Sequence, residues 1–532
     1  MPAPQGLLAE AWLRTPDATW ARVQQDVSGV VGLLPPSAAE TVVALTGLDA
    51  RLGKLVDGAS TWYAVAASGG STAEVGWAAA LPLADPALAA EALLDTSDAR
   101  GAGPGARTVA GMHVIEADAG AAPTVALAGK WLVVASSESD LARLGPYAFR
   151  TMPTKPAPGA APVVASVPGS ALAGVVATQL GAKWEAMRSW LQARDEEQRA
   201  AHGGRAPDFG DPRAILDAAD AVVKRRIAVV GTASAARIEL ATEDGDVRAD
   251  FSLTPGPDGG DAGTAALPVG TAHPLAEAPA DAVLVILSRD DATRRADDAR
   301  ELEVALDRAL GSRAHADDTA AVHAAIDDWA RARGDWVLAS LEWGGEGARG
   351  LWLRTPAASA EGASRAVREL VDLSHRHALE SLLSGALHVA PSVVAAADVA
   401  SVSRASLATF AASGADKHPH PSPPLGVAWG LHDGDLLVAA GGGATAMLAA
   451  QAAPAKRLGD DPRTAHLVES LGADVAFALI ARPLRLDPAR GAGDAGLAPA
   501  VLAWGRKGSD AWVRVELGGA LIRELVRLKA GL

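Results

Sequence analysis

A glycine run is the first feature of this chain whose spacing bears on chemistry. Gly441-Gly442-Gly443-Ala444-Thr445 stands between a predicted strand and a predicted helix, where successive backbone N–H groups could hold a phosphate. The run lacks the lysine and hydroxyl of a phosphate-binding P-loop and the spacing of a dinucleotide fingerprint. The stretch at the equivalent place earlier in the chain, residues 136–140, is acidic and would repel phosphate. The sequence therefore predicts a tight turn with a helix cap, and no cofactor.

Histidines raise the possibility of a metal site. His375 and His377 lie two residues apart, so on a helix they face nearly opposite sides and cannot both bind one ion. His388 follows without a carboxylate in a recognised metal-binding frame. His418 and His420 stand in a proline-rich stretch, where solvated side chains are expected. No metal ligand is predicted.

The sequence also contains no recognisable motif for nucleophilic or acid–base catalysis. The chain has no cysteine, which excludes disulfides, thiolate nucleophiles and cysteine-bound metals. Neither G-x-S-x-G nor S-x-x-K occurs in a convincing strand-turn-helix setting. Acidic pairs such as Asp290-Asp291 and Asp327-Asp328 belong to charged helix surfaces, where solvation is their usual role. No catalytic residue is predicted, and the sequence leaves enzymatic activity open while favouring its absence.

Tryptophan is the dominant aromatic residue, with 14 Trp against 5 Phe and 2 Tyr. Most of these tryptophans fall in or beside strand candidates and alternate with other apolar residues, which predicts core positions. If some instead line a sheet face or a cleft between halves, they would form an apolar groove suited to lipid, peptide or glycan. The candidates for such a ligand groove are Trp62, Trp131, Trp336, Trp352 and Trp429.

The elements that carry these residues recur along the chain. A hairpin followed by a helix is predicted from residue 61 and again from residue 335, and a strand, small-residue turn and short helix follow in both places. Residues 162–167 and 474–480 are apolar runs typical of strands covered on both faces. Closing hairpins are predicted over residues 237–253 and 500–517. The sequence predicts an α+β fold of two related halves, each with mainly antiparallel sheet hairpins packed against helices.

A stretch rich in glycine and proline separates the predicted halves. Residues 255–274 form this linker, because its composition disfavours both helix and sheet. The predicted domains are therefore residues 1–254, with a helical insertion around 170–230, and residues 275–532.

Composition excludes several classes of protein. The 532 residues are 49% hydrophobic and 21% charged, which is typical of a folded chain. A net charge of −15 argues against nucleic-acid binding and against polybasic membrane docking. The sequence contains no apolar run long enough to predict a membrane-spanning helix, and its first residues lack the features of a signal peptide.

Three segments resemble known sequences. They are Leu7-Leu8-Ala9-Glu10-Ala11-Trp12, residues 16–22, and the strand candidate at residues 433–440. Together they resemble uncharacterised exported proteins or lipoproteins of high-GC Gram-negative soil bacteria. The resemblance implies a periplasmic or outer-membrane-associated setting, with membrane anchoring only through a removed N-terminal segment, and it supplies no catalytic residues. A cytoplasmic location is the alternative.

The functional expectation is a non-enzymatic extracytoplasmic binding or scaffold protein whose partner is a protein or an apolar envelope ligand. The alternative is a hydrolase with a dispersed active site at the junction of the two halves. A structural component of a cytosolic assembly is a third possibility.

Overall fold

The protein was analysed as a computed structural model. It describes residues 1–27, 35–46, 50–69, 75–91, 107–115, 123–201, 212–243, 245–256, 267–310, 315–344, 347–376, 392–410, 425–486 and 498–530. The chain divides into two compact units, which are described separately below. Unit 1 comprises Met1–Gln179, Ala228–Gly260 and Ser509–Leu532, and unit 2 comprises Leu180–Ile227 and Asp261–Gly508.

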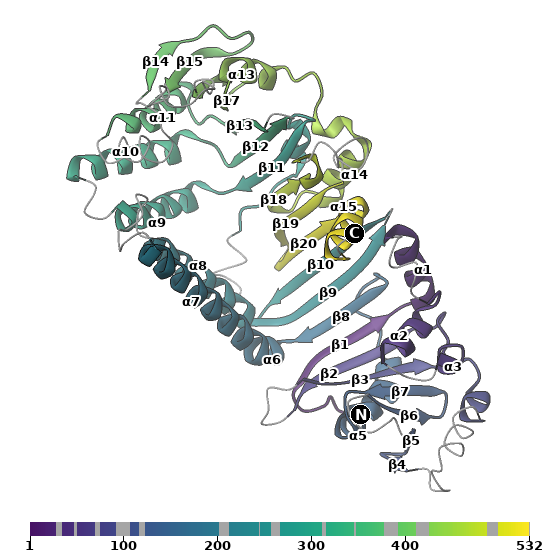
Figure 1. The fold of residues 1–532 in the computed structure, drawn as a ribbon. Coiled ribbons are helices and arrows are strands. Elements are labelled where there is room, and N and C mark those ends of the chain that lie inside the picture. The colour runs from purple at the N-terminus through teal and green to yellow at the C-terminus, as the bar shows by residue number, and fades with distance from the viewer. Residues whose placement is uncertain are drawn as a thin grey trace. The chain divides into compact units, whose positions relative to one another are not determined.

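Unit 1 is an antiparallel sheet with strands in the order β20-β10-β9-β8-β1-β2-β3-β7-β6-β5-β4 (Figure 1). Its strands are β1 (Leu7–Leu13), β2 (Trp62–Ser68), β3 (Val75–Pro82), β4 (Thr108–Val109), β5 (Met112–Ile115), β6 (Thr124–Ala128), β7 (Trp131–Ala135), β8 (Val163–Pro168), β9 (Ala233–Glu243), β10 (Asp246–Pro255) and β20 (Asp510–Leu517). Its helices are α1 (Pro16–Val27), α2 (Ala38–Thr46), α3 (Ala50–Gly53), α5 (Glu138–Arg150), α6 (Gly169–Ala171) and α15 (Gly519–Ala530).

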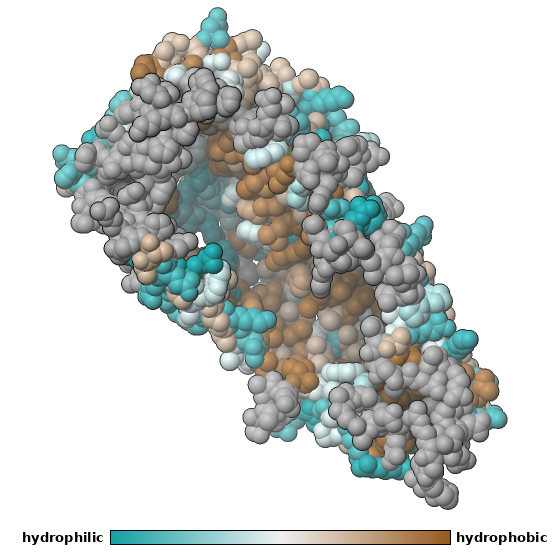
Figure 2. Space-filling view, in the orientation of Figure 1, coloured by the Kyte–Doolittle hydropathy of each residue, from teal (hydrophilic) through white to brown (hydrophobic). Residues whose placement is uncertain are grey.

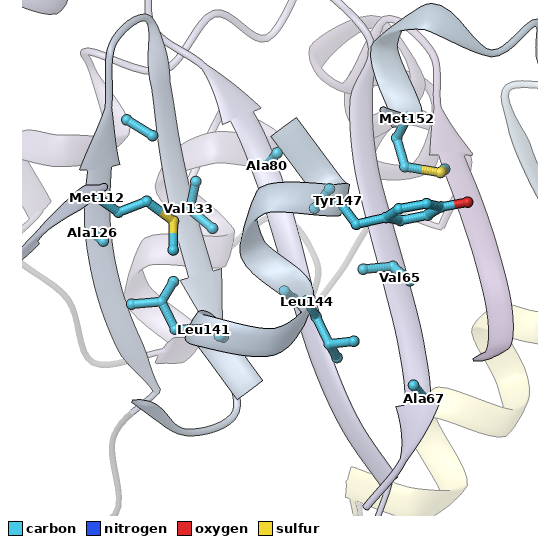
Figure 3. Close-up of a cluster of buried hydrophobic side chains, with 14 of the residues drawn as sticks. Val65, Ala67, Ala80, Met112, Ala126, Val133, Leu141, Leu144, Tyr147 and Met152 are labelled. Atoms are coloured by element: carbon cyan, nitrogen blue, oxygen red, sulfur yellow. The ribbon is translucent and has the colours of Figure 1, made fainter. Parts of the chain in front are cut away.

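Helix α5 covers one face of this sheet. Its start is fixed by Ser137, whose hydroxyl accepts a hydrogen bond from the Asp140 backbone N–H at 3.1 Å. Leu141, Leu144 and Tyr147 recur every three residues, so they lie on one side of the helix. Figure 3 shows these side chains among residues of β2, β3, β6 and β7, and all three are at most 2% exposed.

The strands of unit 2 are also antiparallel, and they pair in the order β19-β18-β11-β12-β13-β17-β16-β15-β14 (Figure 1). Its strands are β11 (Ala282–Arg289), β12 (Trp336–Gly344), β13 (Gly347–Pro356), β14 (Val393–Ala396), β15 (Ser403–Phe410), β16 (Leu425–His432), β17 (Asp435–Gly441), β18 (Val475–Ala481) and β19 (Ala500–Lys507). Its helices are α9 (Ala292–Leu310), α10 (Ala316–Ala332), α11 (Ala360–Asp372), α13 (Ala444–Ala452) and α14 (Pro462–Leu471).

Helices cover both faces of the unit 2 sheet at its β15–β17 end. Residues of α11 and the end of α10 pack against Trp429, Leu431 and Leu436, whereas α13 packs against the opposite side of the same strands. Helix α11 is capped by Ser359, whose hydroxyl accepts a hydrogen bond from the Gly362 backbone N–H at 3.0 Å. This end of the sheet therefore has a core on each side.

Two long helices, α7 (Ala177–Ala201) and α8 (Pro212–Gly231), occupy the region of the predicted helical insertion. The boundary between the units falls within both helices. In their unit 2 portion, the Trp184 indole N–H donates to Asp220 at 2.7 Å and Arg188 donates to Asp217 at 2.6 Å. Arg225 of α8 forms an ion pair with Glu301 of α9 at 3.0 Å. These polar contacts join α7 to α8, and α8 to the rest of unit 2.

The predicted α+β class with antiparallel hairpins is confirmed. Beyond that, the pairing order of the first nine strands recurs in β11 to β19. In unit 1, β1 pairs with β2 and β8, and β3 pairs with β7, and in unit 2, β11 pairs with β12 and β18, and β13 pairs with β17. Duplication of one α+β unit stays a prediction, and this recurrence is the observation that supports it.

The compact units differ from the predicted domains 1–254 and 275–532 in two segments. Residues 180–227 belong to unit 2, and residues 509–532 belong to unit 1. The second difference has a physical cause in β20, which pairs with β10 along its length. This register pairs the apolar residues Val513 and Phe251 with each other, and it pairs Arg514 with the oppositely charged Asp250. Residues 257–266 of the predicted linker lie outside the described residues.

Candidate functional site

The sheet of unit 2 is apolar on both faces, but only one face is buried along β11, β12, β18 and β19. Side chains alternate between the faces of a strand. Val285, Leu338 and Ile480 on one face are each at most 1% exposed. Their neighbours on the other face are half-buried, and Leu351 is 51% exposed. This second face, called the open face of unit 2, consists of Leu284, Ile286, Ala339, Leu341, Leu351, Leu353, Phe477, Leu479, Leu502 and Trp504.

Strand register makes the open face of unit 2 continuous. Leu502 lies opposite Leu479, which lies opposite Ile286. Ile286 lies opposite Ala339, which lies opposite Leu353. Directly paired residues in an antiparallel sheet project from the same face and touch. One apolar row therefore crosses five strands, a span of about 19 Å at the usual strand spacing.

Aromatic and basic side chains mark the β19 end of this face. The rings of Phe477 and Trp504 stack with centroids 3.9 Å apart and planes inclined by 12°. Arg506 follows Trp504 on the same face, because exposed and buried residues alternate regularly along β19. The open face thus combines an aliphatic surface with a flat aromatic pair and one cation.

The space-filling view agrees with this assignment. Figure 2 shows hydrophobic residues gathered over β11, β12, β18 and β19. Exposed apolar area that is contiguous, rather than scattered, marks interaction sites on proteins. The open face of unit 2 is accordingly the candidate site.

Unit 1 has a comparable surface on β9, β10 and β20. Leu240, Phe251 and Val513 alternate onto one face and are 39%, 40% and 37% exposed. The reverse face of these strands is charged, and there Arg514 donates to Asp250 at 2.6 Å. Each unit therefore has an apolar sheet face that is only partly covered.

The five tryptophans predicted to line a groove lie elsewhere. Trp62, Trp352 and Trp429 are 6%, 2% and 0% exposed, so their rings are core residues. Trp131 is half-buried and meets Tyr63 edge to face at 5.8 Å. The fifth, Trp336, is half-buried in β12 and is not part of the open face. The structure does not bring the five together on that face, because their strands point most of them into cores.

One strand prediction is corrected by the same observation. The apolar run at residues 474–480 predicts a strand covered on both faces, yet Phe477 and Leu479 of β18 are half-buried. Continuous apolarity alone does not distinguish a strand buried twice from one with an open apolar face. The signal that sequence reasoning missed was the coincidence of Phe477, Trp504 and Arg506, which depends on pairing β18 with β19.

A polar cluster in unit 1 joins β1 to α5 and to the segment after it. The Tyr147 hydroxyl donates to Glu10 Oε1 at 2.5 Å, and Lys155 Nζ donates to the same oxygen at 2.5 Å and to the Tyr147 hydroxyl at 2.6 Å. Burial, reinforced by Glu10, raises the pKa of Tyr147. Burial also acts to lower the pKa of Lys155, but its hydrogen bonds to Glu10 and Tyr147 outweigh burial and raise that pKa. Tyr147 therefore keeps its proton at neutral pH, and the cluster acts as a structural clasp.

The Lys155→Met variant tests this clasp. Because the pKa of Lys155 is raised in the folded state, its contribution is fully present below the unfolded-state pKa and is lost as the pH rises through the folded-state pKa. The side chain is 38% exposed, so we expect a loss of about 1 kcal/mol or less near neutral pH. Urea unfolding of both proteins over an alkaline pH series measures the difference. A difference that grows with pH would contradict the assignment.

Arg482 is the most deeply buried charged residue of unit 2 among those described, at 2% exposure. Its guanidinium donates to the Ala280 carbonyl at 2.9 Å and to the Thr464 hydroxyl at 2.8 Å. Burial lowers its pKa to about 10, and the neighbouring Arg485 acts in the same direction. These two hydrogen bonds tie the end of β18 to the segment before β11 and to α14, so Arg482 has a structural role.

The glycine run and the histidines singled out by the sequence carry no site in the described residues. Gly443 caps α13 with a left-handed φ of 81°, a conformation that favours glycine. His375 ends the short helical turn after α11, whereas His377, His388, His418 and His420 lie outside the described residues. Within the described ranges, no group of three or more His, Asp or Glu side chains could hold a metal ion.

Comparisons with known proteins add little. No protein-family model matches the chain, and no curated protein matches it. A solved structure of TP0453 in crystal form III is 11% identical, with a TM-score of 0.21, and the match covers 48% of this chain and 81% of that one.

Among the residues that the structure describes, no helix is both long enough and apolar enough to cross a bilayer.

Proposed function

We propose that this chain is a non-enzymatic binding protein that holds an apolar ligand on the open face of unit 2. One observation carries the proposal: a sheet with two apolar faces buries one of them and leaves Ile286, Leu479 and Leu502 half-buried on the other. A folded chain gains by covering such a surface, at about 2.5 kcal/mol for each 100 Å² of apolar area. A ligand that supplies this cover is retained by the same free energy, less the cost of immobilising it.

Surface shape and chemistry favour a flexible apolar chain over a glycan or a peptide. A glycan or an extended peptide carries hydroxyl, N–H or C=O groups that need hydrogen-bond partners when they are buried. The row from Leu502 to Leu353 presents only aliphatic side chains. An acyl chain can lie on this row without burying an unpaired polar group.

The test is binding of a hydrophobic fluorophore, N-phenyl-1-naphthylamine, followed by its displacement with a medium-chain amphiphile. We expect saturable enhancement of fluorescence and complete displacement. Native mass spectra recorded after incubation with an envelope lipid extract should show a discrete one-to-one adduct. Non-saturable fluorescence together with an unliganded mass would contradict the proposal and favour the protein scaffold.

An extracytoplasmic setting is also part of the proposal, supported by the resemblance of the segment that begins at Leu7 to exported proteins. Fractionation of cells that express the tagged natural gene tests the location. Recovery with the periplasm or outer membrane is expected, and recovery with the cytosol would overturn it. The hydrolase alternative places its site at the junction of the predicted halves and stays a prediction.

A further inference from the structure

Arg506 lies at the margin of the open face of unit 2 and is the penultimate residue of β19. Alternation along β19 places it on the same face as Leu502 and Trp504. Lys507 follows directly and projects from the opposite side of the strand, where it is exposed. The open face therefore ends in one guanidinium that belongs to the same strand as its aromatic pair.

The hydrogen bonding of this guanidinium is incomplete. One terminal nitrogen, Nη1, donates to the Gly508 carbonyl at 3.2 Å. The Nε atom is enclosed and has no hydrogen-bond partner. Turning the Arg506 side chain would therefore break no hydrogen bond at Nε, although it would break the 3.2 Å hydrogen bond from Nη1 to Gly508. The guanidinium can turn toward a ligand on the open face at small cost.

The negative net charge of the chain makes a local cation necessary for binding an anion. At −15, the protein repels anions in general, so a bound anion needs a local positive group. An arginine fork binds a planar carboxylate through two parallel N–H donors, Nε and one terminal nitrogen. A single fork suits a single carboxylate better than it suits a phosphate, which usually recruits several cations or backbone amides.

We infer that the ligand of the open face is a long-chain carboxylate, with its acyl chain on the apolar row and its carboxylate on Arg506. This inference rests on the proposed function and narrows it to one class of amphiphile. The apolar row crosses five strands from Leu502 to Leu353, so a single acyl chain has room beside Trp504. The stacked Phe477 and Trp504 rings would flank the first carbons after the headgroup.

Three probes with the same chain distinguish the headgroup. Dodecanoate, dodecyl phosphate and dodecanol are used to displace N-phenyl-1-naphthylamine from the full chain. We expect dodecanoate to displace the fluorophore at about tenfold lower concentration than dodecanol, since a hydrogen bond to a charged group contributes about 1.5 kcal/mol or more. Dodecyl phosphate should be weaker than dodecanoate.

Variants of neighbouring residues give the matched comparison. Arg506→Gln should bring dodecanoate and dodecanol within about twofold of each other. Lys507→Gln removes the same charge from the next residue and should leave the tenfold preference intact. Arg506→Lys keeps the charge without the fork and should retain part of the preference. Thermal unfolding of each variant verifies that the fold persists.

The outcomes separate this inference from the proposed function. Equal displacement by dodecanoate and dodecanol, or a preference that survives Arg506→Gln, overturns the carboxylate inference and leaves apolar binding standing. Stronger displacement by dodecyl phosphate overturns the choice of carboxylate. Failure of the fluorophore to bind overturns the proposed function, and the inference with it.

Discussion

Replacing Leu479 and Leu502 together with glutamine is expected to weaken binding of the hydrophobic fluorophore by about 100-fold. The two side chains face each other across β18 and β19 in the middle of the apolar row. Because each leucine is already half-buried, covering the rest of it is worth about 0.5 kcal/mol, and burying a glutamine amide in its place costs about 1 kcal/mol or more, so the two changes together amount to about 3 kcal/mol. Because both residues are already half-buried rather than core, the fold should persist. A fluorescence titration measures the change.

The matched control makes the same chemical change elsewhere. Leu370 and Leu525 are 38% and 50% exposed on α11 and α15, and neither belongs to the open face of unit 2. Their joint replacement with glutamine should leave the dissociation constant within about twofold of the original value. Equal losses in both double variants would indicate a general effect of surface polarity and would contradict the assigned site.

Replacing Trp429 with alanine is expected to lower the free energy of unfolding of unit 2 by about 3–5 kcal/mol. The ring is 0% exposed and packs with Val367, Leu436 and other residues of the α11 core. Its indole N–H also donates to the Ser364 hydroxyl at 3.3 Å. Urea unfolding followed by circular dichroism measures the loss. The substitution removes a core residue, so any effect on ligand binding should follow from unfolding alone.

Trp190→Ala is the matched control, because it removes an exposed tryptophan instead of a buried one. Trp190 is 59% exposed on α7, and its ring contacts Arg194 in a cation–π arrangement. Trp190→Ala should change the free energy of unfolding by about 0.5 kcal/mol or less. A Trp429→Ala variant that unfolds like Trp190→Ala, yet loses fluorophore binding, would restore Trp429 to the predicted ligand groove.

Hairpins were the part of the fold that local sequence could predict. The strands β2 and β3, and later β12 and β13, pair where turn residues separate two apolar runs. The pairing of β20 with β10 could not be predicted in this way, because it joins residues more than 250 positions apart, such as Asp250 and Arg514. Non-local pairing depends on which apolar faces match, and single-strand patterns do not contain that information.

The candidate site, too, could be predicted from the sequence only where it depends on local pattern. Alternation along residues 500–507 indicates which side chains share a face, and it places Leu502, Trp504 and Arg506 together. Whether that face is buried depends on helices from elsewhere in the chain. Trp352 and Trp429 are predicted groove residues because they are aromatic residues in strand candidates, and the same property places them in cores.

Photo-crosslinking locates the bound acyl chain on the protein directly. A dodecanoate analogue with a diazirine in its chain is bound to the full chain, irradiated, and mapped by mass spectrometry of the peptides. We expect labels on the open-face strands β11, β12, β13, β18 and β19, and we expect excess dodecanoate and the Leu479→Gln, Leu502→Gln double variant to suppress the labelling. Competable labelling confined to other segments, such as α7 or α15, would contradict it.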